Sequence, residues 1–341
     1  MATNSYTGQA SSGNITNLQS IAELLKAADV VEVLDKLVKT IPASGNSTDT
    51  VGLLRAVTPE VIVQEVSEGV NPTSLALTYE KVERTFQEFA LVMSVTSRQA
   101  ELGEYDVVAD SKNRIVDLMK RIREKNAWFE YRAGNGVVFH SAAVTARNQV
   151  NGPITLGALR KTADVLLENR ASYMVEMTKG SVNQKTVPMQ AAFPVLFHVN
   201  GRADVRNLPG FVPRAQIGGY SDTMPQVFGT VDEFLFISSP ELEPFFGAGA
   251  AVGATGMKSI GGTNVDVYPF LVFGKDALGK VSLRGKDRGL GGFQMKYLGD
   301  ADKSDPGNLL RLISLRWWDN PLILNQNWVR RIEAGVTANP L

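Results

Sequence analysis

The chain contains no cysteine and only two histidines, His140 and His198. The absence of cysteine excludes disulfides, thiolate metal sites and a cysteine nucleophile. Neither histidine belongs to a spacing typical of metal ligands, and His198 lies in an apolar run that favours a core position over a base or a ligand. We therefore expect no metal site, no cofactor and no histidine-based catalysis.

An excess of one charge and a long hydrophobic run are also absent. The 35 Lys and Arg residues balance the 35 Asp and Glu residues, so the chain lacks the positive excess of a dedicated DNA-binding protein. It has no run of 18 apolar residues, and residues 1–17 have neither the basic start nor the apolar middle of a signal peptide. We expect a protein that is neither exported nor bound to a membrane.

Glycine is abundant, most of all in residues 247–262. The spacing in residues 247–253 is GxGxxxG and not the GxGxxG of dinucleotide sites, and Met257 separates Gly256 from Lys258 in what resembles a phosphate loop. A mobile surface loop is the favoured interpretation, and a site for a phosphorylated ligand is the alternative. No Gly-x-Ser-x-Gly motif marks a nucleophile. We therefore expect no catalytic residue.

Two charged segments have more than one interpretation. Residues 300–307 place three aspartates close together, but the sixth and twelfth positions of a calcium loop would fall on Asp305 and Arg311, so we expect an acidic turn. Residues 280–289 are basic and glycine-containing. They favour a solvated loop, with contact to phosphates or to an acidic neighbouring subunit as the alternative.

Residues 105–132 predict a long helix that organises the rest of the chain. Its apolar residues recur with helical period, no Gly or Pro interrupts it, and its polar side is basic; the expected apolar face is Ile115, Leu118, Met119, Ile122 and Phe129. A solvated face with local ion pairs and a docking surface for an acidic partner both fit this pattern.

The residues before this helix predict an arm and a hairpin. Residues 1–17 read as a mobile arm, Ser20 and Glu23 form a capping box for a helix that ends at Pro42, and residues 43–58 read as a linker. Alternating residues over 61–96 then predict a long antiparallel hairpin with a net charge of minus three and little apolar surface. Such a hairpin is marginal alone and must lie on another surface, of its own chain or of a neighbour.

The residues after the long helix predict an α+β body. Gly134 and Gly136 turn the chain, Thr155 begins a second helix, and strands are expected around residues 195–199, 233–237 and 265–273, with Asn200 as a helix cap. Residues 309–332, with Trp317, Trp318, Trp328 and the Arg330–Arg331 pair, predict strands that return to the long helix.

The order of these parts resembles the major capsid proteins of tailed bacteriophages, in particular the family of short-tailed phages and related prophages. The similar pieces span nearly the whole chain: residues 68–72 with 75–78, the strand over 89–96, the helix over 105–132, residues 265–274 and the closing residues 327–333. The resemblance implies an α+β capsid fold with an N-terminal arm in 1–60, an extended β-hairpin loop in 61–100, and a spine helix with the first part of a peripheral domain in 101–149. It further implies an axial domain in 150–310 and closing peripheral strands in 311–341.

The same resemblance implies a function and partners. It implies self-assembly as pentamers and hexamers into an icosahedral shell, built in the host cytoplasm and enclosing double-stranded DNA through non-specific contacts. Scaffold, portal and decoration proteins are further expected partners. The alternatives are a nanocompartment shell of the same fold and an enzyme that uses residues 247–262.

Charge then gives one hypothesis about assembly. The net negative hairpin of one subunit is expected to lie over the net positive helix of its neighbour, where ion pairs set register and buried apolar area supplies affinity. The candidate interface residues are Glu65, Glu68, Lys81 and Arg84 of the hairpin and Lys120, Arg121 and Arg123 of the helix.

Overall fold

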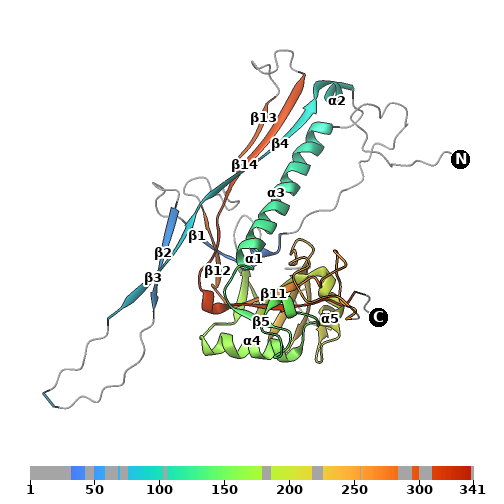
Figure 1. Ribbon diagram of the computed structural model, residues 1–341. Helices are drawn as coiled ribbons and strands as arrows, with labels where there is room; N and C mark the ends of the chain where they lie inside the picture. The colour runs from blue at the N-terminus through green and yellow to red at the C-terminus, as the bar shows by residue number, and fades with distance from the viewer. Residues whose placement is uncertain are drawn as a thin grey trace.

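The computed structural model describes most of the chain between residues 32 and 338. Its described residues are 32–42, 50–57, 68–69, 76–102, 106–178, 186–216, 226–253, 255–282, 294–298 and 309–338. Figure 1 shows one long helix beside a long narrow sheet, a compact body below them, and a hairpin that projects to one side. The capping box at Ser20 and Glu23, the strand over 61–66, the basic residues 283–289 and the acidic turn over 300–307 lie outside the described residues.

Helix α3 (Val107–Tyr131) confirms the long spine helix. Its 25 residues make a rod of about 38 Å. The carboxylate of Asp106 accepts a hydrogen bond from the Ala109 backbone N–H at 2.9 Å, which satisfies one of the free N–H groups of the first turn. At the other end the Arg132 N–H donates to the Trp128 carbonyl, and the chain turns towards the body.

The buried face of α3 is only partly the predicted one. Ile115 is buried, but Leu118 and Phe129 are 42% and 41% exposed, so the prediction is wrong for these two residues. The reason is that α3 crosses two layers. Its first half packs on the long sheet, while its last turns bury Trp128 and Tyr131 in a different cluster, and each layer selects its own side of the helix.

The long sheet beside α3 has the strand order β13–β14–β4. Strands β4 (Gln87–Thr96), β14 (Leu310–Asp319) and β13 (Gln294–Leu298) pair antiparallel. The Phe89 and Trp317 rings stack at 5.6 Å, and Trp317 is buried in the layer between this sheet and α3. Strand β4 thus confirms the predicted strand over 89–96. Strand β14 confirms the predicted return of the C-terminal strands to the long helix, since its Trp317 packs there.

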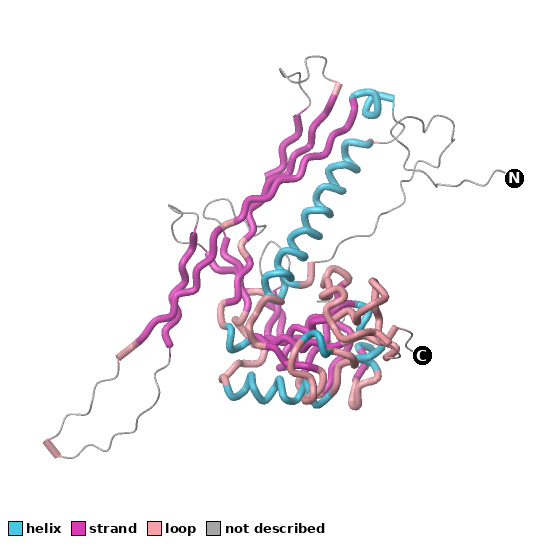
Figure 2. The backbone as a smooth tube through the Cα atoms, viewed as in Figure 1, coloured by secondary structure: helices cyan, strands magenta, loops and turns pink. Residues whose placement is uncertain are grey.

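The projecting hairpin starts earlier than the sequence predicts. Strand β2 (Thr50–Val57) pairs antiparallel with β3 (Thr78–Thr85), and the turn at Glu68–Gly69 lies at the far end of the projection (Figure 2). The linker expected over residues 43–58 is therefore wrong for β2. The polar residues 44–50 and Gly52 resemble a linker, although the strand already begins at Thr50.

The N-terminal helix is also shorter than predicted among the described residues. Helix α1 (Leu34–Leu37) is a single turn, and residues expected to continue it form strand β1 (Lys39–Pro42). Strand β1 pairs parallel with β12 (Leu278–Ser282), which pairs antiparallel with β15 (Pro321–Ile323). This small sheet joins the N-terminal segment to the base of the spine.

The body is built on an eight-stranded sheet with the order β5–β16–β11–β7–β10–β9–β8, to which β6 adds by pairing with β7. Its strands are β5 (Val137–Phe139), β6 (Met174–Thr178), β7 (Thr186–His198), β8 (Val212–Pro213), β9 (Val227–Val231), β10 (Phe234–Ser239), β11 (Tyr268–Phe273) and β16 (Val329–Ala334). Every residue of β10 and β11 is buried, because both sheet faces are covered. The expected strands near residues 195, 235 and 270 are confirmed.

Helices cover this sheet and short turns connect it. Thr155 caps the start of helix α4 (Leu156–Glu168), as predicted. The Thr155 hydroxyl accepts a hydrogen bond from the Ala158 N–H at 3.3 Å. The remaining elements are α2 (Ser97–Leu102), α5 (Arg202–Arg206), η1 (Arg147–Gln149), η2 (Val199–Gly201), η3 (Arg214–Gln216) and η4 (Gln326–Trp328). The cap of η2 is His198 and not Asn200, since the His198 ring accepts from the Asn200 N–H.

The closing strand corrects one further expectation. Strand β16 lies between β5 and β11 in the body sheet, so the return of residues 309–332 to the spine is wrong for this strand. Its Glu333 is fully buried and accepts hydrogen bonds from Arg147 at 2.6 and 2.8 Å and from Arg331 at 2.7 Å. In the part of the chain that the structure describes, no helix is long and apolar enough to cross a bilayer.

Candidate assembly interface

The two faces of the β2–β3 hairpin have different surroundings. Leu53 and Val82 are opposite each other in the register and pack towards Phe86 at the root of the hairpin. The other face carries Leu54 and Tyr79, which are 71% and 61% exposed. One face therefore attaches the hairpin to its own chain, and the other is left to solvent.

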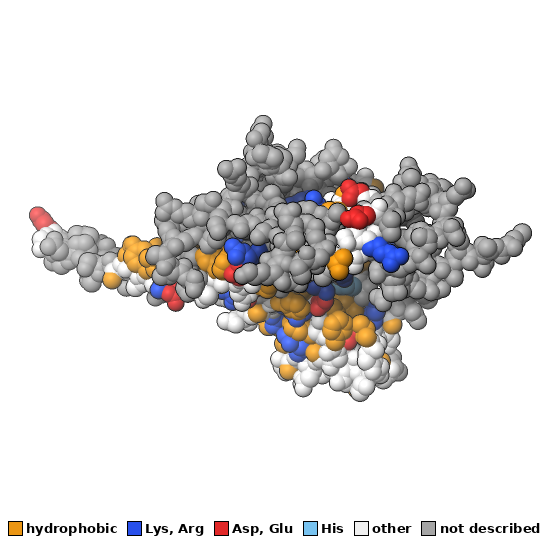
Figure 3. All heavy atoms as spheres, turned by 90° about the horizontal axis from the view of Figure 1, so that it is seen from above, with side chains coloured by type: hydrophobic (Ala, Val, Ile, Leu, Met, Phe, Trp, Pro, Cys, Tyr) orange, Lys and Arg blue, Asp and Glu red, His pale blue; other side chains and the backbone are white. Residues whose placement is uncertain are grey.

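Large apolar side chains are also exposed just before β3, towards the tip of the hairpin. Leu77 is 57% exposed, and Figure 3 shows hydrophobic side chains along the projecting hairpin, away from the body. A two-stranded ribbon has no sheet or helix behind it to bury such residues. Contiguous exposed apolar residues on a monomer typically mark a surface that another chain covers.

Ion pairs hold the paired strands of the hairpin and tie its root to the spine helix. Arg55 of β2 pairs with Glu80 of β3 across the strands, and Lys81 pairs with Glu83 along one strand. Arg84 donates to Glu130 of α3 at 2.7 Å, which ties the hairpin to the spine helix. The predicted interface residues Lys81 and Arg84 thus have partners within their own chain, and Glu68 lies exposed at the far turn, whereas Glu65 is outside the described residues.

The basic residues of α3 are also engaged within the chain. Arg121 donates to Glu241 of the body at 2.9 Å, and Lys120 lies 3.5 Å from Asp117 one turn earlier. Arg123 is buried, so the expectation that it faces a neighbouring subunit is not met. Its guanidinium instead contacts Glu32 at 3.3 Å, in the segment that precedes α1.

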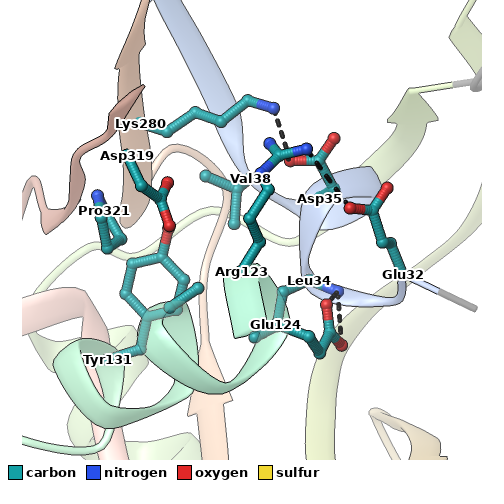
Figure 4. A pocket seen from close by; sticks show the side chains of 11 residues that line it. Glu32, Leu34, Asp35, Val38, Arg123, Glu124, Tyr131, Lys280, Asp319 and Pro321 are labelled. Carbon is teal, nitrogen blue, oxygen red and sulfur yellow. Dashed lines mark hydrogen bonds and ion pairs between the residues drawn. The ribbon is translucent and has the colours of Figure 1, made fainter. Parts of the chain in front are cut away.

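Arg123 belongs to a partly buried ionic cluster that sequence reasoning missed (Figure 4). The cluster surrounds a small cavity where the N-terminal segment, α3, β12 and the end of β14 meet; its charged members are Glu32, Asp35, Arg123, Glu124, Lys280 and Asp319. Four carboxyl groups thus share two cations. The available signal was the position of Arg123 and Glu124, which continue the buried side of α3 two turns after Ile115.

Burial controls the protonation of this cluster. It raises the pKa of Glu124 to about 8, although the Leu34 and Val33 N–H groups, which donate to its carboxylate, act in the opposite direction. Burial likewise raises the pKa of Asp319 to about 6 and that of Glu32. For Asp35, burial also opposes ionisation, but the charges of Lys280 and Arg123 hold its pKa below the usual value.

The contacts of Glu124 attach the N-terminal segment to the spine. Its carboxylate accepts from the Val33 N–H at 3.1 Å and from the Leu34 N–H at 3.2 and 3.3 Å. Val33 and Leu34 are themselves buried in the core that contains Trp128. Hydrogen bonds and apolar packing together fix the direction in which the chain enters the fold.

The glycine-rich loop is folded, and several of its backbone N–H groups already donate hydrogen bonds within the chain. The carboxylate of buried Asp266 accepts from the Gly247 N–H and from the Ile260 N–H, both at 2.8 Å. A carboxylate of the chain thus occupies N–H groups that a phosphate would need. Among the described residues no group of His, Asp and Glu is arranged to hold a metal ion. His198 is half-buried at the end of β7 rather than in the core.

Comparisons with known proteins agree with this geometry. No family model matches the chain. It is 23% identical over 212 residues to the major capsid protein of Pseudomonas phage KPP21, which covers 58% of this chain; the chain spans about half, 53%, of that relative's length.

Solved structures match over nearly the whole chain. The capsid of Ralstonia phage GP4 superposes with a TM-score of 0.63 at 9% identity and covers 100% of both chains. The head of Helicobacter pylori bacteriophage KHP40 gives 0.63 at 11% identity, covering 94% of this chain and 95% of that one. The capsid of cyanophage P-SCSP1u gives 0.61 at 14% identity, covering 94% and 93%. The expected fold is confirmed.

Proposed function

We propose that this chain, which has the fold of tailed-phage capsid subunits, is a major capsid protein that assembles into an icosahedral shell around double-stranded DNA. The observation that carries the proposal is the combination of that fold with a hairpin whose outer face, around Leu54 and Tyr79, is apolar and uncovered. The hairpin is too thin to bury this face itself. A second copy is the surface that a closed lattice of identical subunits always provides.

The proposed role is structural and not enzymatic. The subunits form pentamers and hexamers, in which the hairpin of one copy lies on its neighbour and the glycine loop 247–262, with exposed Phe246 and Ile260, lies towards other copies. Scaffold, portal and decoration proteins are the further partners we propose, and the packaged DNA contacts the shell non-specifically. The shell is part of the virion and is built in the host cytoplasm.

A sedimentation experiment tests this function. The full chain is expressed alone and with a candidate scaffold protein, and the lysate is run on a sucrose gradient and imaged by negative stain. We expect particles in the megadalton range, or capsomers of five or six subunits. An oligomer smaller than a pentamer under all conditions would contradict shell formation. A nanocompartment is distinguished by its contents, since it encloses protein cargo, whereas phage particles protect DNA from nuclease.

A further inference from the structure

A groove with a volume of about 500 Å³ opens on the body where α4, edge strand β5 and turn η4 meet. Two cations line it, Lys161 of α4 and Arg330 of β16, together with Gly136, Val137 and Gln326. No Asp or Glu of the described residues lines this groove. It therefore presents two positive charges that no carboxylate of its own lining compensates.

Arg330 is held in the groove by backbone carbonyls. Its Nη1 donates to the Gln326 carbonyl at 3.0 Å and to the Val329 carbonyl at 2.9 Å. A Cβ at Gly136 would lie 2.4 Å from this Nη1 and 2.8 Å from the Val329 carbonyl, so glycine allows the guanidinium to lie where it does. The carbonyls orient the guanidinium but do not neutralise it, which leaves its charge for another acceptor.

Strand β5 adds a backbone edge to the same groove. Val137 pairs with Arg331 of β16 on one side, and the other side of β5 has no strand partner among the described residues. Val137 is itself exposed at this edge. An open sheet edge beside a groove accepts an extended peptide through backbone hydrogen bonds, while charged side chains set which peptide is accepted.

The distal hairpin has the matching chemistry. Between Arg55 and Lys81 the sequence holds four glutamates and no lysine or arginine, and of these Glu80 is already paired with Arg55. The turn at Glu68 lies at the far end of the projection, which leads away from the body of its own chain (Figures 1 and 2). A second copy must therefore supply its receptor.

The spine helix is a poorer receptor than the groove. Arg121 and Lys125 of α3 lie close to Glu241 and Glu243 of the body, so their charges are compensated within the chain. An incoming acidic segment would have to displace those carboxylates. At the groove no carboxylate has to be displaced, because none from the described residues lines it.

We propose that the segment between β2 and β3 of one copy, residues 58–77, binds in this groove of a neighbouring copy, with its glutamates facing Lys161 and Arg330. The inference rests on the proposed function and names the receptor of the hairpin within it. In this proposal the receptor of the hairpin is the groove on the body, and not the basic residues of the spine helix. It also commits to one occupant, a second copy of this chain.

Cross-linking in assembled particles tests the contact directly. Because the chain has no cysteine, single cysteines introduced as Glu68→Cys and Lys161→Cys react only with each other or with a second copy of themselves. Copies carrying one substitution each are mixed, assembled and treated with a short bismaleimide. We expect a mixed dimer on a denaturing gel. The matched control replaces Lys161→Cys with Lys275→Cys, an exposed lysine of the body outside the groove, and should give at least five-fold less dimer.

Charge exchange tests the energetics in the intact chain. Lys161→Glu and Glu68→Lys should each lower particle yield at least three-fold, and the double variant should recover most of it. Lys275→Glu, which makes the same charge change outside the groove, should leave the yield unchanged. Asp302→Lys, in the other acidic segment, should not be rescued by Lys161→Glu; rescue there would assign the groove to that segment and overturn the proposal.

The two proposals fail in different ways. If the unsubstituted chain forms neither particles nor capsomers, the shell function itself is wrong. If it forms normal particles but Glu68→Cys couples no better to Lys161→Cys than to Lys275→Cys, the groove is not the receptor, while the shell function stands. If a cysteine variant does not assemble, the charge-exchange rescue decides the matter alone.

Discussion

Arg84, at the root of the projecting hairpin, lies 2.7 Å from Glu130 in the last turn of α3, although 46 residues separate them in sequence. This pair is one of the contacts that set the angle between the hairpin and the spine helix. Both side chains are partly exposed, so the pair adds little to the stability of the fold and much more to direction.

Removing this pair should therefore separate stability from assembly. We expect Arg84→Ala to change the free energy of unfolding by about 1 kcal/mol or less, because exposed ion pairs contribute about that much. Particle yield should fall more than stability does, since the hairpin leaves at a less defined angle. Urea unfolding and sucrose gradients measure the two effects, and the charge-reversed pair Arg84→Glu with Glu130→Arg serves as the rescue.

The two faces of β3 give a second prediction. Tyr79→Ser on the exposed face should leave the free energy of unfolding within about 0.5 kcal/mol, as is usual for surface substitutions, yet abolish particles because the covered surface is lost. Val82→Ala, three residues later on the packed face, should destabilise the subunit by about 1–2 kcal/mol. If Tyr79→Ser subunits assemble normally, the outer face of the hairpin is not an interface.

Local patterns predicted a large part of the fold. The periodicity of α3, the alternation of β4 and the cap at Thr155 depend on residues close in sequence, so they are visible without the structure. Strand β2 was missed because Gly52 and the polar residues 44–50 before it resemble a linker. In the fold, a Cβ at Gly52 would lie 2.8 Å from the Cε of Lys81, whose flexible and exposed side chain can move aside.

Long-range contacts explain what the sequence did not predict. The charged cluster joins Val33 to Glu124 across 91 residues, and the body groove joins Gly136, Lys161 and Arg330 from three separate elements. No local pattern relates such residues. The expected docking surface on α3 failed at Arg123 for a related reason, since its partner Glu32 comes from a distant segment that covers it.

Glu333 gives a third prediction, about the junction of spine and body. It is fully buried, accepts hydrogen bonds from Arg147 and Arg331, and Arg331 also donates to the Arg132 carbonyl at the end of α3. Glu333→Gln keeps the shape but leaves two cations without their carboxylate. Removing one partner of such a network costs about 3–5 kcal/mol.

Thermal or urea unfolding of the subunit measures this loss. The matched control is Glu243→Gln, a partly exposed partner of Lys125 in the same region, for which we expect less than about 1 kcal/mol. Equal losses for the two variants would mean that the buried network is not what fixes β16 against the spine.

The protonation of Glu124 gives a fourth prediction, about pH. Its pKa is about 8 in the fold and near 4.5 in the unfolded chain, so the folded state favours the protonated carboxyl. The stability that this group contributes is fully present below pH 4.5 and is lost as pH rises to about 8, by a few kcal/mol at most. Docking of residues 32–38 onto α3 should therefore weaken towards alkaline pH.

Glu124→Gln removes the titration while an amide oxygen can still accept from the Val33 N–H. We expect the unsubstituted subunit to lose thermal stability between pH 5.5 and 8.5, and the variant to lose clearly less over the same interval. Protease cleavage within residues 32–38, followed by mass spectrometry at both pH values, locates the change in this segment. Asp35 works in the opposite direction, because its lowered pKa gives stability that is lost only on acidification. An equal pH response in the variant would therefore place the titrating group elsewhere in the cluster, with Asp319 the next to test.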